Sequence, residues 1–379
     1  MILEQRRWTA DEGWKGVSKL ADTAQVVFLF GGTSALSDGA WRKDLQAAYP
    51  KAALFGCSTA GEIADVRVYD DTIVATAVRF EHTNFKIHQV KLSEVDGSVQ
   101  AGERLAEALD HKGLVHVFVL SDGQHVNGSE LVRGLISKLP KSVQVTGGLA
   151  GDGARFERTL VFANNEANEG AVSIMGFYGD KLRVGYGSLG GWDTFGPVRQ
   201  VTRSEGNVLF ELDGKPALDL YRTYLGEHAD GLPATGLLFP LNVQRPDAER
   251  PLVRTILGVD EDKQSLTFAG DVPEGSKAQL MKANFDRLID GASDAAKASY
   301  ESLGGPESPD FAVLISCVGR KLVLKQRTEE EVEGVRSVLG ESTVLTGFYS
   351  YGEMCPAAPN ADCELHNQTM TITTFRELS

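Results

Sequence analysis

AALFGCSTAGE (residues 52–62) is the first of three segments in which a short apolar run leads into a glycine loop that closes on an acid. The others are VQVTGGLAGD (residues 143–152) and TVLTGFYSYGE (residues 343–353). Glycine at such positions usually adopts a positive φ or lets another backbone segment approach closely. If each run is a buried strand, its loop lies at the carboxyl end, where open α/β sheets bind ligands. The repetition predicts three related loops that line one or two pockets; the alternative is that they are only tight strand-to-helix turns.

Short runs rich in β-branched or aromatic residues predict strands, and amphipathic runs between them predict helices. Strands are expected at residues 25–30, 72–80, 114–120, 159–163, 170–177, 182–189, 236–243, 252–259, 311–318 and 369–375. Helices are expected at residues 39–49, 98–109, 129–139, 278–299 and 328–339. This order predicts a mixed α/β fold, with parallel βα units near both ends and a strand-rich middle.

The length of 379 residues predicts two domains or one duplicated architecture, because one small core does not extend over such a chain. The clearest change in composition is GGWDTFG (residues 190–196). We therefore expect a two-domain architecture, with an N-terminal domain over residues 1–200 and a C-terminal domain over residues 201–379, packed closely together.

Charge and hydropathy argue against two classes of function. A net charge of −14 and a pI near 5.0 disfavour nucleic-acid binding, which needs clustered Lys and Arg. The longest apolar stretches are of strand length, far below the roughly 20 residues of a membrane helix. The basic N-terminus is not followed by the apolar segment of a secretory signal. We expect a cytoplasmic protein that binds neither nucleic acid nor membrane.

The chain has four cysteines that show no zinc-finger spacing, so free thiols are expected: Cys57, Cys317, Cys355 and Cys363. The alternative for Cys355 and Cys363, which are close in sequence, is a disulfide or a metal clip. Cys57 follows a predicted strand, where helix-terminal N–H groups would lower the pKa of its thiol and favour a nucleophile. No histidine has a spacing that marks it as the base. A small buried residue or a ligand contact is the favoured interpretation of Cys57, and an enzyme is the alternative.

The acids that close the three loops, Glu62, Asp152 and Glu353, also have two interpretations. Paired carboxylates carry out acid–base chemistry, whereas a lone acid at a helix N-terminus stabilises the helix dipole. The capping interpretation is favoured, with one acid left to hold a ligand amine. Four aromatic residues near glycines suit either stacking on a flat ligand or a core between domains; they are Trp192, Phe195, Tyr349 and Tyr351.

Five segments together resemble the FIST family, whose name refers to F-box and intracellular signal transduction proteins. They are FGCSTAGEI (residues 55–63), VTGGLAGDG (145–153), EGNVLFELDGKPALDLYRTYLG (205–226), TGFYSYGEM (346–354) and CELHNQTMTITTF (363–375). Their order is that of the family, and they cover both its N-terminal and its C-terminal domain. The resemblance implies a bacterial or archaeal sensory protein that binds a small ligand such as an amino acid. Some bacterial members bind haem b, sense nitric oxide and act on a partner histidine kinase or cyclic-di-GMP enzyme, so output to a separate protein is expected here.

Haem ligation usually needs a histidine in an apolar pocket. His366 lies in LHNQT, inside a segment that resembles the family, and Asn367 is placed to orient its ring. The alternative is that both residues only bond to the turn. His228, in LGEHADG, is the second candidate, and His125 follows SDGQ as an active-site loop residue would.

The sequence thus favours a sensor that is not an enzyme, with haem b as a possible cofactor. Residues expected at the ligand are Gly56, Cys57, Ser58, Thr59, Gly61, Glu62, Gly147, Gly148, Asp152, Trp192, Tyr349, Glu353 and Asn367, with His366 or His228 on the metal. A bulky residue at Gly147 is expected to abolish ligand binding while leaving the fold intact. The alternatives are an amino-acid or other metabolite sensor without haem, an enzyme that uses Cys57, and a scaffold with an empty cleft.

Overall fold

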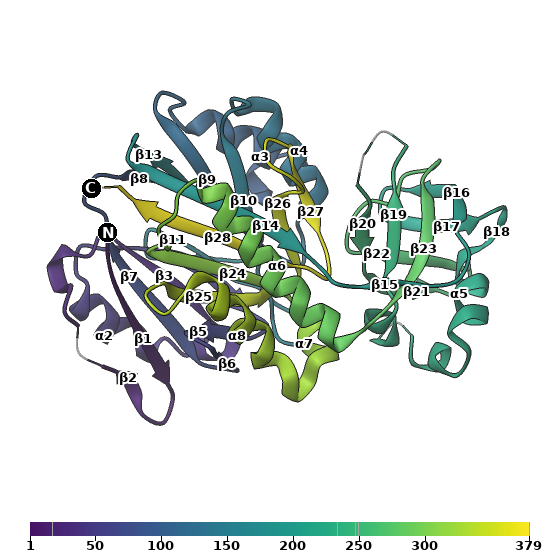
Figure 1. Ribbon diagram of the computed structural model, residues 1–379, viewed down its shortest axis with the longest axis horizontal. Helices are drawn as coiled ribbons and strands as arrows, with labels where there is room; N and C mark the ends of the chain where they lie inside the picture. Colours follow the sequence, from purple (N-terminus) through teal and green to yellow (C-terminus); the bar gives the residue numbers. More distant parts are fainter. Residues whose placement is uncertain (17, 233, 247, 249, 379) are drawn as a thin grey trace.

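The computed structural model describes residues 1–16, 18–232, 234–246, 248 and 250–378, and two bodies of unequal size are visible in it (Figure 1). We call residues 1–192 and 283–378 the large body, and residues 193–282 the small body. The chain leaves the large body after β14 (Leu182–Leu189) and returns at the start of α6 (Phe285–Leu303). The small body is therefore an insertion between two parts of the large one.

Three parallel strand pairs form the centre of the large body, and the second strand of each pair leads into a glycine loop. The pairs are β3 (Val26–Gly32) with β4 (Ala53–Thr59), β9 (Leu114–Ser121) with β10 (Gln144–Leu149), and β24 (Phe311–Cys317) with β25 (Val344–Ser350). The helical crossovers within the pairs are α1 (Thr33–Asp38), α2 (Ala40–Ala48), α4 (Gly128–Lys138), α7 (Val318–Leu324), η5 (Lys325–Arg327) and α8 (Thr328–Leu339). β3 and β24 are buried along their whole length, as expected for strands covered on both faces.

Antiparallel strands extend each pair into a sheet. The first pair continues into β7 (Ile73–Arg79), β1 (Ile2–Thr9) and β2 (Gly13–Lys15); the second into β13 (Ala171–Tyr178) and β8 (Asn84–Lys91); the third into β28 (Met370–Glu377) and β14. Short 3₁₀-helices, η1 (Ala21–Thr23) and η2 (Leu92–Glu94), lie in the connections. The mixed α/β fold expected from the sequence is confirmed.

Each glycine loop leads into a hairpin that pairs with a different repeat. β5 (Glu62–Ala64) and β6 (Arg67–Tyr69) join β25; β11 (Val161–Ala163) and β12 (Glu166–Asn168) join β4; β26 (Gly352–Pro356) and β27 (Cys363–His366) join β10. The three sheets are thus linked in a ring by exchanged hairpins. The glycine loops connect strand to strand, so the strand-to-helix interpretation is wrong.

Aromatic side chains fill the space where the three sheets meet. Phe28 of the first sheet packs on Phe118 of the second, with ring centroids 6.3 Å apart, and on Phe311 of the third at 5.3 Å. Phe118 also contacts Phe375, at 6.5 Å. On the outside, α3 (Gly97–Ala108) packs against α4, and α6 packs against α8 and β14. This arrangement fixes the carboxyl ends of the parallel strands, from which the candidate site is built.

The small body is an antiparallel sheet that packs around one helix. Its strands are β15 (Asp193–Thr194), β16 (Arg199–Glu205), β17 (Val208–Leu212), β18 (Lys215–Pro216), β19 (Leu241–Gln244), β20 (Leu252–Arg254), β21 (Ile256–Asp260), β22 (Ser265–Phe268) and β23 (Lys277–Lys282). The helical elements are α5 (Ala217–Leu225), η3 (Gly226–Gly231) and η4 (Ala234–Leu238). α5 contributes Leu218 and Tyr221 to the core, where they pack with Phe268.

Three expected elements differ from the structure. The strand expected at residues 252–259 is divided into β20, which pairs with β19, and β21, which pairs with β22. The helix expected at residues 278–299 begins only at Phe285, because residues 277–282 form the strand β23, which pairs with β19. The strand expected at residues 236–243 begins at Leu241, after η4. The expected domain boundary near residue 200 falls within β16. The division into an N-terminal domain (residues 1–200) and a C-terminal domain (residues 201–379) stays a prediction.

Candidate functional site

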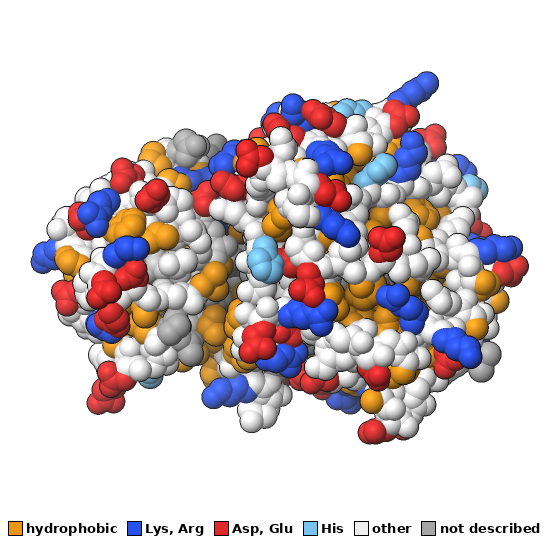
Figure 2. Space-filling view, turned by 180° about the vertical axis from the view of Figure 1, so that it is seen from behind, with side chains coloured by type: hydrophobic (Ala, Val, Ile, Leu, Met, Phe, Trp, Pro, Cys, Tyr) orange, Lys and Arg blue, Asp and Glu red, His pale blue; other side chains and the backbone are white. Residues whose placement is uncertain are grey.

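A cavity of about 760 Å³ lies where the large and small bodies meet. Its large-body wall comes from loops at the carboxyl ends of β9, β10 and β25, and its small-body wall from β21, β22 and the nearby 3₁₀-helices. Figure 2 shows hydrophobic side chains exposed in the groove between the two bodies. The cavity therefore lies at the strand ends where the sequence predicts a ligand, but part of its wall comes from the small body.

Asp122 organises the loop that follows β9. This buried carboxylate accepts hydrogen bonds from the backbone N–H groups of Gln124 (2.9 Å) and His125 (2.7 Å), and its Oδ1 lies 3.1 Å from His125 Nδ1. Its second oxygen accepts from Thr159 Oγ1 (2.7 Å) and from the Gly170 N–H (3.1 Å). The loop is thus held from both sides, and His125, which is 62% exposed, is presented at the cavity with its Nε2 unengaged by Asp122.

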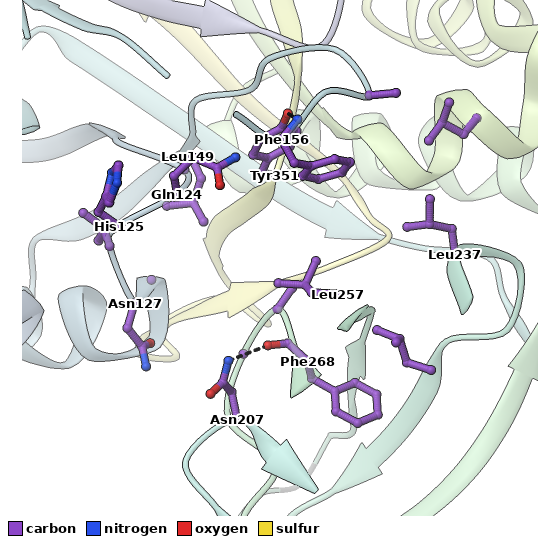
Figure 3. A pocket seen from close by; sticks show the side chains of 18 of the residues that line it. Gln124, His125, Asn127, Leu149, Phe156, Asn207, Leu237, Leu257, Phe268 and Tyr351 are labelled. Carbon is purple, nitrogen blue, oxygen red and sulfur yellow. Dashed lines mark hydrogen bonds between the residues drawn. The ribbon is translucent and has the colours of Figure 1, made fainter. Parts of the chain in front are cut away.

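Tyr351 and Phe156 form the second part of the large-body wall (Figure 3). Their rings stack with centroids 4.4 Å apart. The Tyr351 hydroxyl accepts from the Asp152 N–H (2.9 Å) and the Phe156 N–H (3.2 Å), and it donates to the Gly153 carbonyl (3.2 Å). Phe156 has a φ of 56°, a left-handed conformation that is strained for a bulky residue. One hydroxyl therefore stabilises a strained loop at the edge of the cavity.

The small body supplies the opposite wall. In Figure 3, Leu257 and Phe268 lie across the cavity from Tyr351, and Leu237 lies to one side. Asn207 donates to the Phe268 carbonyl (2.7 Å), which fixes its amide at the cavity. The two walls are bridged by Asn127, because its Oδ1 caps α4 at the Glu130 N–H (3.2 Å) and its Nδ2 lies 3.5 Å from Asp271 of the small body.

The lining of the cavity is apolar with a few neutral polar groups. Among the described residues that line it, none is Asp, Glu, Lys or Arg. The polar side chains are Gln124, His125, Asn127, Asn207 and Tyr351. The Gln124 amide nitrogen is buried and has no hydrogen-bond partner among the described residues, so a ligand acceptor would complete its bonding. The arrangement suits an uncharged or weakly polar molecule.

Three glycines of the loop segments, Gly56, Gly147 and Gly347, lie inside the strands β4, β10 and β25. A Cβ on Gly56, Gly147 or Gly347 would meet the carbonyl oxygen of the partner strand at 1.8, 2.0 and 1.8 Å respectively. These glycines allow close approach within the parallel pairs. The expectation that a bulky residue at Gly147 leaves the fold intact is therefore wrong.

The first loop segment is buried and does not line the cavity. Cys57 is fully buried, and burial raises the pKa of its thiol well above the ordinary value, which is the opposite of the lowering expected for a nucleophile. Ser58 accepts from the Leu160 N–H (2.8 Å), and Thr59 donates to Glu62. A Cβ on Gly61 would meet the Lys321 ammonium.

The three loop acids do not cap helices, so the capping interpretation is wrong. Glu62 and Glu353 lie in β5 and β26, and burial raises their pKa values to about 7 and about 8. Asp152 lies in a turn. Burial raises its pKa, but its hydrogen bonds, of which those from Arg155 are the strongest, outweigh burial and hold the pKa below the usual range.

The remaining expected ligand residues are also packed inside the protein. Gly148 pairs with Glu353 between β10 and β26. Trp192 donates to the Gln368 carbonyl (2.8 Å), and the Tyr349 hydroxyl donates to Glu331 (2.6 Å). The Asn367 amide donates to the His366 carbonyl (3.0 Å). None of the thirteen expected residues lines the cavity, and their assignment to a ligand stays a prediction.

The two expected haem ligands lie outside the cavity wall. His366 is buried, its Nε2 lies 2.8 Å from the Cys355 carbonyl, and burial lowers its pKa. His228 is exposed in η3, and its ring packs on Phe239 at 5.2 Å. Within the part of the chain that the structure describes, no group of three or more His, Cys, Asp or Glu residues is arranged to hold a metal ion.

Sequence reasoning found only part of this site. His125 was recognisable from SDGQH after a strand, and Tyr351 from its glycine neighbours. Leu257 and Phe268 carry no local signal, and Asn207 has only its place in the family-like segment at residues 205–226, because these residues meet the large body only through the insertion of the small body.

Comparison with known proteins gives a family match. Residues 25–215 match the FIST N domain and residues 217–356 match the FIST C domain. FIST domains are in general sensory, ligand-binding domains of signal-transduction proteins. The chain is also 27% identical over 206 residues to an uncharacterized protein of Methanocaldococcus jannaschii; the match covers 51% of this chain and 38% of that protein, little more than a third of its length.

Solved structures give weaker likenesses. A chorismatase aligns over 99% of this chain and 98% of its own, at 8% identity and a TM-score of 0.35. A cyanuric acid hydrolase from A. caulinodans aligns over 78% of this chain and 100% of its own, at 10% identity and a TM-score of 0.20. Scores at this level carry no argument about the reaction or the fold.

In the described ranges, no helix is long and apolar enough to cross a membrane.

Proposed function

The chain belongs to the FIST family, and on that premise we propose that it is a sensor that binds a small ligand in the cavity between its two bodies. The observation that supports this most directly is that one cavity of about 760 Å³ has walls from both bodies. The bodies are joined by two short segments, at residues 190–192 and 283–284. A ligand that contacts both walls favours one arrangement of the bodies, and a separate partner protein reads that arrangement.

The proposed ligand is an uncharged metabolite with an apolar part and hydrogen-bonding groups. The described lining residues include no charged side chain. The ammonium and carboxylate of an amino acid would lose water there without gaining a counter-charge, which is costly. Gln124, Asn127 and Asn207 offer amide donors and acceptors, and the Phe156–Tyr351 pair offers a flat surface. An uncharged metabolite therefore suits the cavity better than an amino acid.

A haem-based nitric oxide sensor is the second candidate, and His125 favours it. Its Nδ1 is engaged by Asp122, and a carboxylate on one ring nitrogen orients the other toward a metal. The fit is partial, because the propionates of haem would find no Lys or Arg among the described lining residues. When bound, haem iron supplies a coordination position for a diatomic gas. His125, rather than His366 or His228, is the residue that would hold it.

The proposed output is regulation of a partner, a histidine kinase or a cyclic-di-GMP enzyme, rather than catalysis. Burial of Cys57 weakens the alternative of an enzyme that uses this thiol. If Cys57 were a nucleophile, Cys57→Ala would abolish a turnover that the folded protein otherwise shows. A sensor should keep its ligand response in this variant.

Thermal unfolding with a panel of uncharged metabolites tests the sensor. A ligand should raise the unfolding temperature of the wild type in a saturable way, following RT ln(1 + [L]/Kd). Leu257→Trp, which adds bulk to a residue that lines the cavity, should remove the response. Leu189→Trp, at a similarly exposed leucine on β14 outside the cavity, should keep it. A response that survives Leu257→Trp would place the ligand elsewhere.

Absorption spectroscopy tests the haem candidate. Titration with haem should give a Soret band that shifts with nitric oxide, and His125→Ala should alter it while His366→Ala and His228→Ala should not. Absence of a band in the wild type, or its loss only in His366→Ala, would contradict this assignment.

A further inference from the structure

A second cavity, of about 670 Å³, lies on the far side of the segment that lines the first. It is lined by α4, β20, β27, the loop at residues 357–362, and Arg245, Ala248 and Arg250 of the connection between β19 and β20, so both bodies contribute to it. Gly270 lines the first cavity and its neighbour Asp271 lines the second, so the chain at these two residues borders both cavities. Unlike the first cavity, this one is rich in charged groups.

Arg254 is the central feature of the second cavity. Its residue is only 4% exposed, yet it lines the cavity. Its Nε donates to the Asp271 carbonyl (2.9 Å), and its Nη1 donates to the carbonyls of Leu365 (3.0 Å) and Val253 (3.2 Å). These carbonyls fix the orientation of the guanidinium without neutralising its charge. Among the described residues, no carboxylate oxygen lies within 4.0 Å of it.

The acids near Arg254 already have donors. Glu364 pairs with Arg245, and Asp362 pairs with Lys141 at 2.8 Å. Asp271 lies close to Arg254 and faces the amide of Asn127. Burial lowers the pKa of Arg254 to about 10, which reflects the cost of keeping this cation away from water. An anion in the cavity would offset that cost.

The rest of the lining limits the kind of anion. Several aliphatic side chains face the same space: Val132, Ile136, Leu252, Pro273 and Leu365. A guanidinium suits the planar oxygens of a carboxylate, with which it forms paired hydrogen bonds. A phosphate dianion would need a second buried cation, and the other arginines that line the cavity are paired or exposed. Arg245 pairs with Glu364, Arg250 is exposed and donates to the Ala357 carbonyl (2.8 Å), and Arg133 is 60% exposed and lies 3.5 Å from Glu130.

We propose that the second cavity binds a small monocarboxylate with an apolar chain, whose carboxylate pairs with Arg254 and whose chain packs on the aliphatic lining. This site is distinct from the cavity of the proposed sensor function and does not depend on it.

Hexanoate tests the proposal, with hexanamide and inorganic phosphate as comparison ligands. Calorimetric titration and thermal unfolding of the full chain should show saturable binding of hexanoate and much weaker binding of the other two. Arg254→Gln should weaken hexanoate roughly ten- to a hundredfold, as expected for a lost bond to a charged group. Arg222→Gln, an exposed arginine of the same body paired with Glu261, should change nothing.

A second variant keeps the test decisive if Arg254→Gln unfolds. Ala358→Phe leaves Arg254 itself unchanged, places a bulky ring in the cavity from the loop, and should abolish hexanoate binding in a folded protein. Leu257→Trp, which blocks the first cavity, should leave hexanoate binding unchanged. Equal binding of hexanamide, preference for phosphate, or hexanoate binding that survives Ala358→Phe would each overturn the proposal.

Discussion

Glu62 and Glu353 occupy equivalent positions in two repeats of the large body and are held in the same way. Each accepts a hydrogen bond from the hydroxyl three residues earlier, Thr59 or Ser350. Each also accepts from the N–H and hydroxyl of a single threonine: Thr72 for Glu62, at 2.9 and 2.8 Å, and Thr369 for Glu353, at 3.3 and 3.0 Å. Through these hydrogen bonds, Glu62 joins the first glycine loop to the start of β7, and Glu353 joins the third glycine loop to the start of β28.

The raised pKa values of these acids predict that stability falls as pH rises. The folded state holds the proton up to about pH 7 at Glu62 and about pH 8 at Glu353, whereas an unfolded glutamate releases it near its ordinary value. The folded state is therefore progressively destabilised from about pH 4.5 to above pH 8, by an amount on the order of a few kcal/mol. Urea unfolding at pH 5, 7 and 9 measures this slope.

The matched variants for this slope are Glu353→Gln and Glu333→Gln. Glutamine keeps a carbonyl acceptor and cannot ionise, so Glu353→Gln should reduce the loss of stability at high pH. Glu333 is exposed on α8, and Glu333→Gln should leave the slope unchanged. Equal slopes in all three proteins would show that Glu353 is not protonated in the folded state at neutral pH.

Tyr351→Phe tests the role of the hydroxyl at the cavity edge. The variant keeps the stacked ring but leaves the N–H groups of Asp152 and Phe156 without their acceptor, which should cost about 1–3 kcal/mol of unfolding free energy. Tyr178→Phe is the control, because the Tyr178 hydroxyl is buried without a partner among the described residues and its loss should not destabilise the protein. Equal effects of the two substitutions would argue against a special role for Tyr351.

The buried ion pair between Arg320 and Glu331 should contribute far more to the free energy of unfolding than the surface pair between Arg327 and Glu330. Both side chains are fully buried; Arg320 Nε and Nη2 lie 3.0 and 2.8 Å from Glu331, and Nη1 donates to the carbonyl of Gly190, where the chain leaves for the small body. Glu331→Gln leaves this cation without its counter-charge and should cost about 3–5 kcal/mol.

Glu330→Gln provides the comparison on the same helix. Glu330 pairs with Arg327 at the surface, and such pairs contribute about 0–1 kcal/mol. Urea unfolding at pH 7 compares the variants. If Glu331→Gln lost no more unfolding free energy than Glu330→Gln, the Arg320–Glu331 pair would not be what holds the chain at Gly190, where it leaves for the small body.

Gly147→Ala should destabilise the fold by several times more than Gly305→Ala. A Cβ at Gly147 would lie 2.0 Å from the Val119 carbonyl oxygen, and the residue has a φ of 153°, whereas a Cβ at Gly305 meets no atom within 4 Å. The parallel pair β9–β10 would have to separate to accept the methyl group. Thermal unfolding checks this, and similar unfolding temperatures would show that the pair yields easily.

The sequence by itself determined which runs form buried strands and where glycines allow a close approach of two backbones. Runs such as Leu114–Ser121 and Phe311–Cys317 are apolar without alternation, which predicts strands covered on both faces, and the structure confirms them. Glycines marked the close approaches, and the nearest neighbours of Gly56, Gly147 and Gly347 are the backbones of the paired parallel strands. These features depend on local residue type, so a single sequence contains them.

Only the tertiary structure decided which repeat each hairpin joins, and therefore where the loop acids lie. Glu62 has the same local sequence whether a helix or a strand follows, and it is buried because β5 pairs with β25, almost three hundred residues away in the chain. The same holds for the cavity, which is lined by His125 of the large body together with Leu257 and Phe268 of the inserted small body. Local periodicity records whether a face is buried but not which distant segment buries it, because that choice depends on the packing of the whole chain.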